Sequence, residues 1–162
     1  MSRGSLAHRP VAAGAPALSR VSIPRNEYAK MGAHCLRHRP EEACGLLRGV
    51  VDGGRHARLD RTTPMANRAE GDRARSYQID PTELRIAEDS VVDPPVLGVY
   101  HSHPEGSGRP SYEDVARAWP GYLYLIVPLR GVPTPTARAF TIDPDLSRVR
   151  ELELIVEGIR GR

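Results

Sequence analysis

The chain has 162 residues, of which 40% are hydrophobic and 27% charged, a composition that suits one globular domain and excludes a fully disordered chain. No run approaches the roughly 18 apolar residues of a membrane-spanning helix, and the basic N-terminus lacks the apolar core of a secretory signal, so we expect a cytoplasmic protein. The net charge is +3, but the arginines are interleaved with acids and no series of aromatic residues accompanies them, which argues against a nucleic-acid partner.

The first part of the chain is rich in Ala, Gly, Pro, Ser and Arg and shows no repeat. We expect residues 1–20 to form a flexible leader and residues 21–162 to form the domain. Pro24 suits the first turn of a helix, and apolar residues follow it at helical spacing. This pattern predicts a helix from about Pro24 to Arg37.

Two predicted strands follow this helix. The apolar run Ala43–Val50 is typical of a buried strand, and the alternation of polar and apolar residues over Arg55–Thr62 predicts a second one. The polar stretch Met65–Ser76 indicates a surface loop. Asp80 then supplies an N-cap, followed by a proline and an acid, so we expect a helix over Pro81–Asp89.

The rest of the chain predicts strands around one more helix. In order, these elements are a strand over Val96–His101, a helix from Ser111 to about Trp119, strands over Tyr122–Leu129 and Arg138–Ile142, and a last strand that contains Leu152, Leu154 and Val156. Helices that alternate with strands in this way predict a mixed β-sheet flanked by helices, which is an α/β or α+β sandwich.

Two histidines, His101 and His103, mark the end of the predicted strand over Val96–His101. Residues two apart on a strand point to the same face, so the two imidazoles can converge on one point. The Gly-rich loop that follows can return Asp114, one turn into the next helix, to the same place. Two imidazoles and one carboxylate leave the fourth position of a tetrahedral zinc site to water, which is the pattern of a catalytic rather than a structural zinc.

Such a site needs a general base that is not itself a metal ligand. Glu42 is a good candidate, because it directly precedes a strand that we expect in the same sheet. Its neighbour Glu41 is chemically equivalent, and spacing alone does not separate the two. The hydroxyl of Ser111 can donate to the developing oxyanion.

Each of these residues also has an ordinary structural explanation. A His-x-His pair on a strand often faces solvent, and a lone Glu42 is most simply a surface charge. Ser111 and Asp114 form a helix capping box whatever else they do, and the helix dipole favours an acid in the first turn. Only the joint spacing of these residues indicates a metal site.

That joint spacing resembles the signature of the JAMM (MPN-plus) zinc metallopeptidases. In this family an upstream Glu precedes a His-(Ser/Thr)-His-Pro motif, which is followed by a Ser and an Asp three residues apart. The matching residues here are Glu42, His101-Ser102-His103-Pro104, Ser111 and Asp114. The segment Glu42–Gly49, together with Asn67, Tyr77, Asp80-Pro81 and Gly98–Tyr100, resembles the small prokaryotic branch, and the resemblance covers roughly Val21 to Val156.

The resemblance implies roles for these residues and a fold. The family places its general base two residues before a Cys-Gly pair, which selects Glu42 over Glu41. His101, His103 and Asp114 would hold one catalytic Zn²⁺, and Ser111 would help to hold the oxyanion. The implied fold is an α/β sandwich around a curved, partly barrel-like mixed sheet.

The resemblance also implies a reaction, the cleavage of a peptide or isopeptide bond after the C-terminal Gly-Gly of a ubiquitin-like protein. Some prokaryotic members release cysteine from a sulfur-carrier–cysteine adduct, and this is the activity that we expect. The alternative is a general deconjugase of a ubiquitin-like modifier. A non-catalytic scaffold fits less well, because scaffold relatives typically lose a metal ligand. We expect the Gly-Gly tail to bind extended beside an exposed strand edge, whereas the oligomeric state stays open.

Overall fold

The computed structural model describes residues 17–158, which fold into three helices and seven strands. In chain order these elements are β1 (Arg20–Pro24), α1 (Arg25–Arg37), β2 (Cys44–Asp52), β3 (His56–Met65), α2 (Pro81–Asp89), β4 (Val96–His103), α3 (Tyr112–Arg117), β5 (Leu123–Pro128), β6 (Arg138–Asp143) and β7 (Arg148–Glu157).

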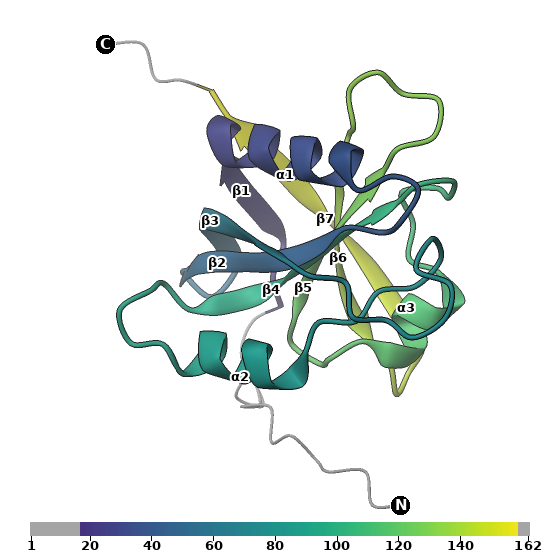
Figure 1. The fold of residues 1–162 in the computed structure, drawn as a ribbon. Coiled ribbons are helices and arrows are strands. Elements are labelled where there is room, and N and C mark those ends of the chain that lie inside the picture. Colours follow the sequence, from purple (N-terminus) through teal and green to yellow (C-terminus); the bar gives the residue numbers. More distant parts are fainter. Residues whose placement is uncertain (1–16, 159–162) are drawn as a thin grey trace, which may run out of the picture.

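The seven strands form one closed barrel in the order β1-β3-β2-β4-β5-β6-β7. The sheet is mixed, because β1 runs parallel to both β3 and β7, and β4 runs parallel to β5, whereas the other neighbours are antiparallel. Helix α1 lies on one side of the strands, and α2 and α3 lie away from it (Figure 1). The prediction of a curved mixed sheet flanked by helices is therefore confirmed, and the sheet closes on itself.

Strand β1 is the element that the sequence pattern missed. Only Val21, Ser22 and Ile23 are buried in it, which is too short a signal to stand out beside the low-complexity residues before it. It nevertheless closes the barrel, since it joins the C-terminal half of β7 to the start of β3.

The ordered part of the chain begins before residue 21, the predicted start of the domain. Arg20 belongs to β1, and the Ser19 N–H donates to the Arg55 carbonyl at 2.8 Å, so the barrel begins at about Ser19. Residues 1–16, on which the rest of this prediction falls, lie outside the described part of the chain.

Several other element boundaries differ from those predicted, including the ends of β2 and β4, which each extend two residues further. Strand β3 continues through Pro64 to Met65, and both residues pair with β2, whereas β1 pairs only with the first residues of β3. Helix α3 stops at Arg117 rather than Trp119, since Pro120 disfavours a helical Trp119 and the Trp119 N–H instead donates to the Tyr124 hydroxyl at 2.6 Å. Strand β7 begins at Arg148, ahead of its predicted apolar residues.

Two buried clusters lie on opposite faces of the barrel wall. Met31 and Cys35 of α1 pack into one cluster with Tyr100 of β4. Leu84 of α2 packs into the other with Val99, the neighbour of Tyr100. Beyond the irregularity in its pairing with β2 near Val96, side chains of β4 thus alternate between the two faces, and those of Val99, His101 and His103 point toward the face that α2 covers.

No helix within residues 17–158 is long and apolar enough to cross a bilayer.

The close approach of β4 to β5 gives a test of this architecture. A Cβ added at Gly98 would lie 1.8 Å from the Leu123 carbonyl oxygen, so Gly98→Ala should force the two strands apart and lower the free energy of unfolding by about 3 kcal/mol. A Cβ added at Gly32 in α1 would lie 4.0 Å from its nearest neighbour, a side-chain atom of Pro135. Gly32→Ala should therefore raise the free energy of unfolding by about 0.5–1 kcal/mol, because alanine has the higher helix propensity. Urea unfolding measures both, and a harmless Gly98→Ala would contradict the strand pairing.

Candidate active site

The end of β4 carries both candidate histidines on one face. Backbone pairing holds this end from two sides, because the Ser102 N–H donates to the Ala43 carbonyl at 3.0 Å and the Leu129 N–H donates to the His103 carbonyl at 3.1 Å. His101 is fully buried, and His103 is 7% exposed. The strand therefore presents two imidazoles with a fixed backbone beneath them.

Helix α3 supplies the candidate carboxylate from its first turn. The Ser111 Oγ accepts the Asp114 N–H at 3.1 Å, and the Asp114 carboxylate accepts the Ser111 N–H at 2.8 Å. This is the predicted capping box, which the structure confirms. Because the cap ties the Asp114 side chain to the helix start, the carboxylate has one well-defined direction.

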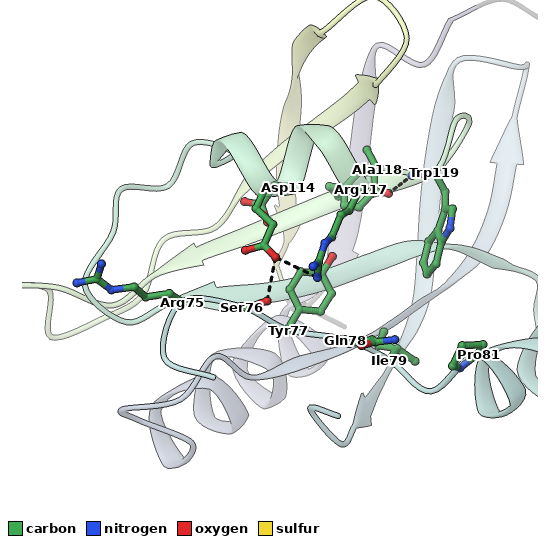
Figure 2. A pocket seen from close by; sticks show the side chains of 12 residues that line it. Arg75, Ser76, Tyr77, Gln78, Ile79, Pro81, Asp114, Arg117, Ala118 and Trp119 are labelled. Carbon is green, nitrogen blue, oxygen red and sulfur yellow. Dashed lines mark hydrogen bonds and ion pairs between the residues drawn. The ribbon is translucent and has the colours of Figure 1, made fainter. Parts of the chain in front are cut away.

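A pocket opens beside Asp114, between α3 and the extended segment 75–79 (Figure 2). Tyr77, Trp119 and Tyr124 give it an aromatic lining, and Arg117 lies at it as well. Glu113 links its two walls, since its carboxylate accepts the Ser76 hydroxyl at 3.2 Å and pairs with Arg117 at 3.0 Å. A molecule in this pocket would lie beside Asp114, the one candidate ligand that lines it.

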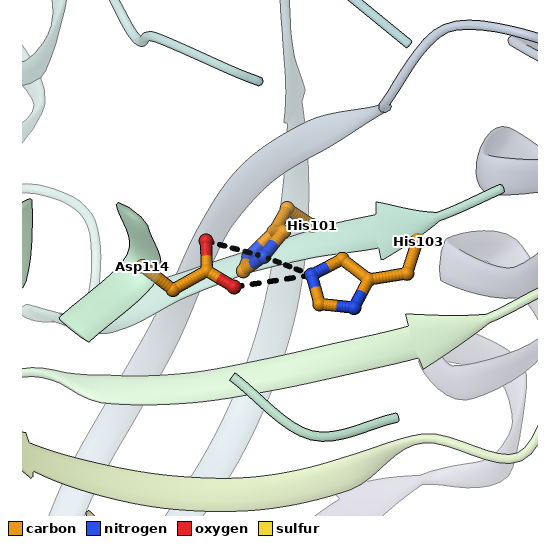
Figure 3. Close-up of side chains that lie close together, drawn as sticks. All are labelled: His101, His103 and Asp114. Carbon is orange, nitrogen blue, oxygen red and sulfur yellow. Dashed lines mark hydrogen bonds and ion pairs between the residues drawn. The ribbon is translucent and has the colours of Figure 1, made fainter. Parts of the chain in front are cut away.

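The structure brings His101, His103 and Asp114 to one point (Figure 3). The Nε2 atom of each histidine lies 3.1 Å from a different carboxylate oxygen of Asp114, and the two Nε2 atoms are 3.1 Å apart. One ligand atom from each residue fits within a cluster in which no two atoms are more than 4.8 Å apart.

The hydrogen bonds of His103 show that this cluster suits a cation. Its Nδ1–H donates to the Ser107 carbonyl at 2.6 Å, so in the neutral ring the Nε2 lone pair faces the Asp114 carboxylate. Two lone pairs that face one another need a proton or a metal ion between them. Hydrogen bonds to Asp114 and to the Ser107 carbonyl accordingly outweigh burial and raise the pKa of His103.

In His101 and Asp114, too, burial and the charges of neighbouring groups shift the pKa in opposite directions. Burial lowers the pKa of His101 despite the attraction of Asp114. Burial would raise the pKa of Asp114, but both histidines and the Ser111 N–H stabilise its carboxylate and hold that pKa far below its ordinary value. The cluster therefore offers an ionised carboxylate and at least one neutral imidazole.

This donor set fits zinc. Two ligands about 2.1 Å from one zinc ion at the tetrahedral angle lie about 3.4 Å apart, close to the 3.1 Å between the two Nε2 atoms. Imidazole nitrogens and a carboxylate oxygen are also ligands that zinc binds in proteins, and three of them leave a fourth position open.

Burial separates the two glutamates that spacing left equivalent. Glu42 is 5% exposed, whereas Glu41 is exposed. Burial raises the pKa of Glu42 to about 8, and the carboxylate of Asp114 adds to this rise while His103 opposes it. The pKa of Glu42 thus responds to the charges of His103 and Asp114. It lies close to the range in which a general base is effective near neutral pH.

The backbone of Glu42 is fastened by a segment that the sequence indicated only as a surface loop. The Glu42 N–H donates to the Arg73 carbonyl at 2.8 Å, and the Glu42 carbonyl accepts from Asn67 Nδ2 at 3.0 Å. Asn67 and Tyr77 are among the residues that carry the family resemblance, but the sequence assigned a role to neither. Their place in that resemblance was the available signal.

Comparison with known proteins gives a consistent result. A family model described as prokaryotic homologs of the JAB domain matches residues 24–143. The chain is 39% identical over 123 residues to a desampylase of Haloferax volcanii, covering 73% of this chain and 80% of the relative. It is 33% identical over 117 residues to a CysO-cysteine peptidase of Mycobacterium tuberculosis, with 69% and 75% covered. It is 30% identical over 112 residues to a probable TtuB-protein conjugate cleaving protease of Thermus thermophilus, with 68% and 71% covered.

Solved structures show the same fold. The solution structure of a protein from Desulfitobacterium hafniense superimposes with a TM-score of 0.73 at 31% identity, covering 86% of this chain and 94% of that one. A protein from Salinibacter ruber gives a TM-score of 0.59 at 26% identity, with 87% and 94% covered.

The raised pKa of Glu42 predicts how the metal-free protein responds to pH. Between the ordinary glutamate pKa of 4.5 and the raised pKa of about 8, the folded protein holds a proton on Glu42 that the unfolded chain releases. This group therefore lowers the free energy of unfolding as the pH rises through that window, by roughly 2–4 kcal/mol in all. Glu42→Gln should remove this decline, which urea unfolding at several pH values in the presence of a chelator measures.

The exposed neighbour provides the matched control for this experiment. Glu41→Gln should leave the pH dependence of stability unchanged, because this side chain lies in solvent. A constant difference between wild type and Glu42→Gln from pH 4.5 to 8 would show that the Glu42 carboxyl is not held protonated.

Proposed function

Since the chain belongs to the prokaryotic homologs of the JAB domain, we propose that it is a zinc-dependent hydrolase that cleaves the peptide or isopeptide bond after the C-terminal Gly-Gly of a ubiquitin-like protein. The observation that carries this proposal is the convergence of His101, His103 and Asp114 beside the buried Glu42. Relatives named for cleaving a protein conjugate and as a CysO-cysteine peptidase support the class of substrate.

His101 and His103 would hold the zinc ion through Nε2, and Asp114 would hold it through its carboxylate. When bound there, zinc supplies a Lewis acid that polarises the scissile carbonyl and lowers the pKa of water. The protein supplies a buried, preformed set of donors, fixed by the end of β4 and by the cap of α3.

Glu42 is the proposed general base. Its carboxylate would take a proton from the attacking water and return it to the leaving amine, so the same group acts first as base and then as acid. Its backbone is bonded on both sides, to Arg73 and Asn67, which fixes the point from which the side chain extends.

Ser111 is the proposed donor to the oxyanion. Its oxygen accepts the Asp114 N–H as a helix cap, and this leaves the hydroxyl proton available for donation to the tetrahedral intermediate. One side chain thus contributes to the stability of α3 and to the proposed reaction.

The expected binding of the Gly-Gly tail beside a strand edge stays a prediction. Each of the seven described strands is hydrogen-bonded to two neighbours, so the barrel offers no strand with a wholly open edge. The pocket between segment 75–79 and α3 shares Tyr77 and Asp114 with the site. We propose that the extended tail reaches the site through this pocket.

The leaving group that we favour is cysteine, amide-linked to a sulfur carrier. A small leaving group demands little surface beyond the carrier and its tail, which suits a chain of this size. The net charge of +3 would assist the capture of an acidic carrier. A general deconjugase uses the same chemistry with a lysine side chain as leaving group. A non-catalytic scaffold is disfavoured because all the proposed ligands are present.

Two substitutions separate the metal ligand from the base. His103→Ala should remove most of the roughly one zinc that we expect per chain, because it deletes a ligand. Glu42→Ala should keep the zinc yet lower kcat by about 10²–10⁴-fold, because it deletes only the proton acceptor. Zinc analysis after gel filtration and cleavage of a Gly-Gly-linked substrate measure the two effects.

Glu41→Ala is the matched control and should retain both zinc and activity, since its side chain lies in solvent. Full zinc occupancy in a His101→Ala/His103→Ala double variant would remove the metal assignment. Loss of activity with Glu41→Ala but not with Glu42→Ala would show that the neighbour is the base.

The substrate proposal is tested by comparing three compounds side by side. We expect the carrier–cysteine adduct to be cleaved fastest, a lysine isopeptide conjugate of the same carrier more slowly, and an unrelated peptide hardly at all. The rate on the adduct should fall with added salt if charge assists capture. Preference for the isopeptide would identify a deconjugase, and equal rates on all three would show that the tail is not recognised.

A further inference from the structure

The two histidines of the cluster are held in different ways. The Nδ1–H of His103 donates to the Ser107 carbonyl at 2.6 Å, which fixes the plane of that ring. The Nδ1 atom of His101 is buried and has no hydrogen-bond partner within residues 17–158. Histidines that bind metals almost always donate their second N–H to a carbonyl or carboxylate, and that bond sets the ring orientation. Another contact has to orient the ring of His101.

Tyr77 makes that contact. Its ring stacks on the imidazole of His101 with centroids 4.3 Å apart and an angle of 24° between the planes. The neighbouring ring of His103 is tilted by 60° at 4.9 Å, so it does not restrict His101 in the same way. We propose that Tyr77 is a positioning residue that sets the ring plane of His101 by stacking, in place of the missing hydrogen bond. This inference rests on the proposed function, in which His101 is a zinc ligand.

Tyr77 is itself held firmly enough for this role. Both of its neighbours are bonded to one side chain, because Asn67 Nδ2 donates to the Ser76 carbonyl at 3.0 Å and Asn67 Oδ1 accepts the Gln78 N–H at 3.2 Å. The Gln78 carbonyl also accepts the Arg68 N–H at 2.8 Å. The backbone on either side of the tyrosine is therefore fixed.

The same asparagine connects this segment to the proposed base. Asn67 Nδ2 donates to the Glu42 carbonyl at 3.0 Å as well. Through Asn67, the aromatic ring that stacks on His101 and the backbone of Glu42 share one anchor. The separation of the ligand from the base is thereby set within the domain, before a substrate binds.

Removal of the ring should act on metal binding first. Without the stack, the imidazole of His101 can turn about its Cβ–Cγ bond and lose its direction toward His103 and Asp114, because no hydrogen bond at Nδ1 opposes the rotation. Loss of an outer partner of a ligand usually lowers metal affinity by about 10–100-fold, and we expect an effect of this size here. The Tyr77 hydroxyl contributes nothing to the stack, so a phenylalanine should serve equally well.

The test compares Tyr77→Leu with Tyr77→Phe. Zinc affinity is measured by competition with a chromophoric chelator, and the visible absorption spectrum of the Co²⁺-substituted protein reports ligand geometry without an activity assay. Tyr77→Leu should bind zinc at least about 10-fold more weakly and change the cobalt spectrum, whereas Tyr77→Phe should stay within about 3-fold of wild type with an unchanged spectrum. Tyr112→Leu is the matched control, because Tyr112 is 92% exposed.

Unfolding of the metal-free variants shows whether a change is merely structural. If Tyr77→Leu does not unfold cooperatively, Tyr77→Met replaces it as the variant without an aromatic face, with the same expected loss of affinity. Wild-type affinity and spectrum in the folded variant that lacks the ring would overturn the inference. Equal weakening by Tyr77→Phe would also overturn it, because the hydroxyl rather than the ring face would then matter. Failure of the wild-type protein to bind zinc would overturn the proposed function, and this inference with it.

Discussion

The whole site depends on the register of one strand, β4. Its side chains alternate between two buried faces, so that Val99, His101 and His103 point one way while Tyr100 and Ser102 point the other. A slip by one residue would send the histidines into the cluster beneath α1. Backbone pairing with β2 on one side and β5 on the other opposes this slip. The Ser102 hydroxyl also fixes the register, because it accepts the Ala43 N–H at 2.9 Å. The same contact places Glu42, one residue before Ala43, beside the end of β4.

The grouping of His101, His103 and Asp114 could be predicted from the sequence because it depends largely on short local spacings. His101 and His103 are two residues apart on one strand, and Ser111 and Asp114 are three apart at a helix start, so local geometry alone brings each pair together. The choice between Glu41 and Glu42 was different. It depends on which side chain turns inward at the start of β2, and only the family resemblance favoured one before the structure showed the burial of Glu42.

The closure of the barrel and the role of segment 66–79 were not readable in the same way. Strand β1 is defined by its long-range partners β3 and β7 rather than by its own composition. Tyr77 lies in a polar stretch, and its importance depends on a partner 24 positions away in the chain, His101. Contacts of this kind produce no repeating pattern of residues in the sequence, because neither partner needs a particular neighbour in the chain.

The pairing of the first described strand with the last has a consequence for how the protein reaches its folded form. Arg20 lies opposite Glu153, and Pro24 lies opposite Glu157, so the barrel is completed only by contacts between the two ends of the described chain. A ribosome must therefore have released nearly the whole domain before the last seam can form, although the ligands of the proposed metal site lie near its middle. Folding that awaits such distant partners is slow compared with that of a helical bundle. Loss of β7 would also leave β1 and β6 each with an unpaired edge, the kind of surface through which β-proteins join into aggregates.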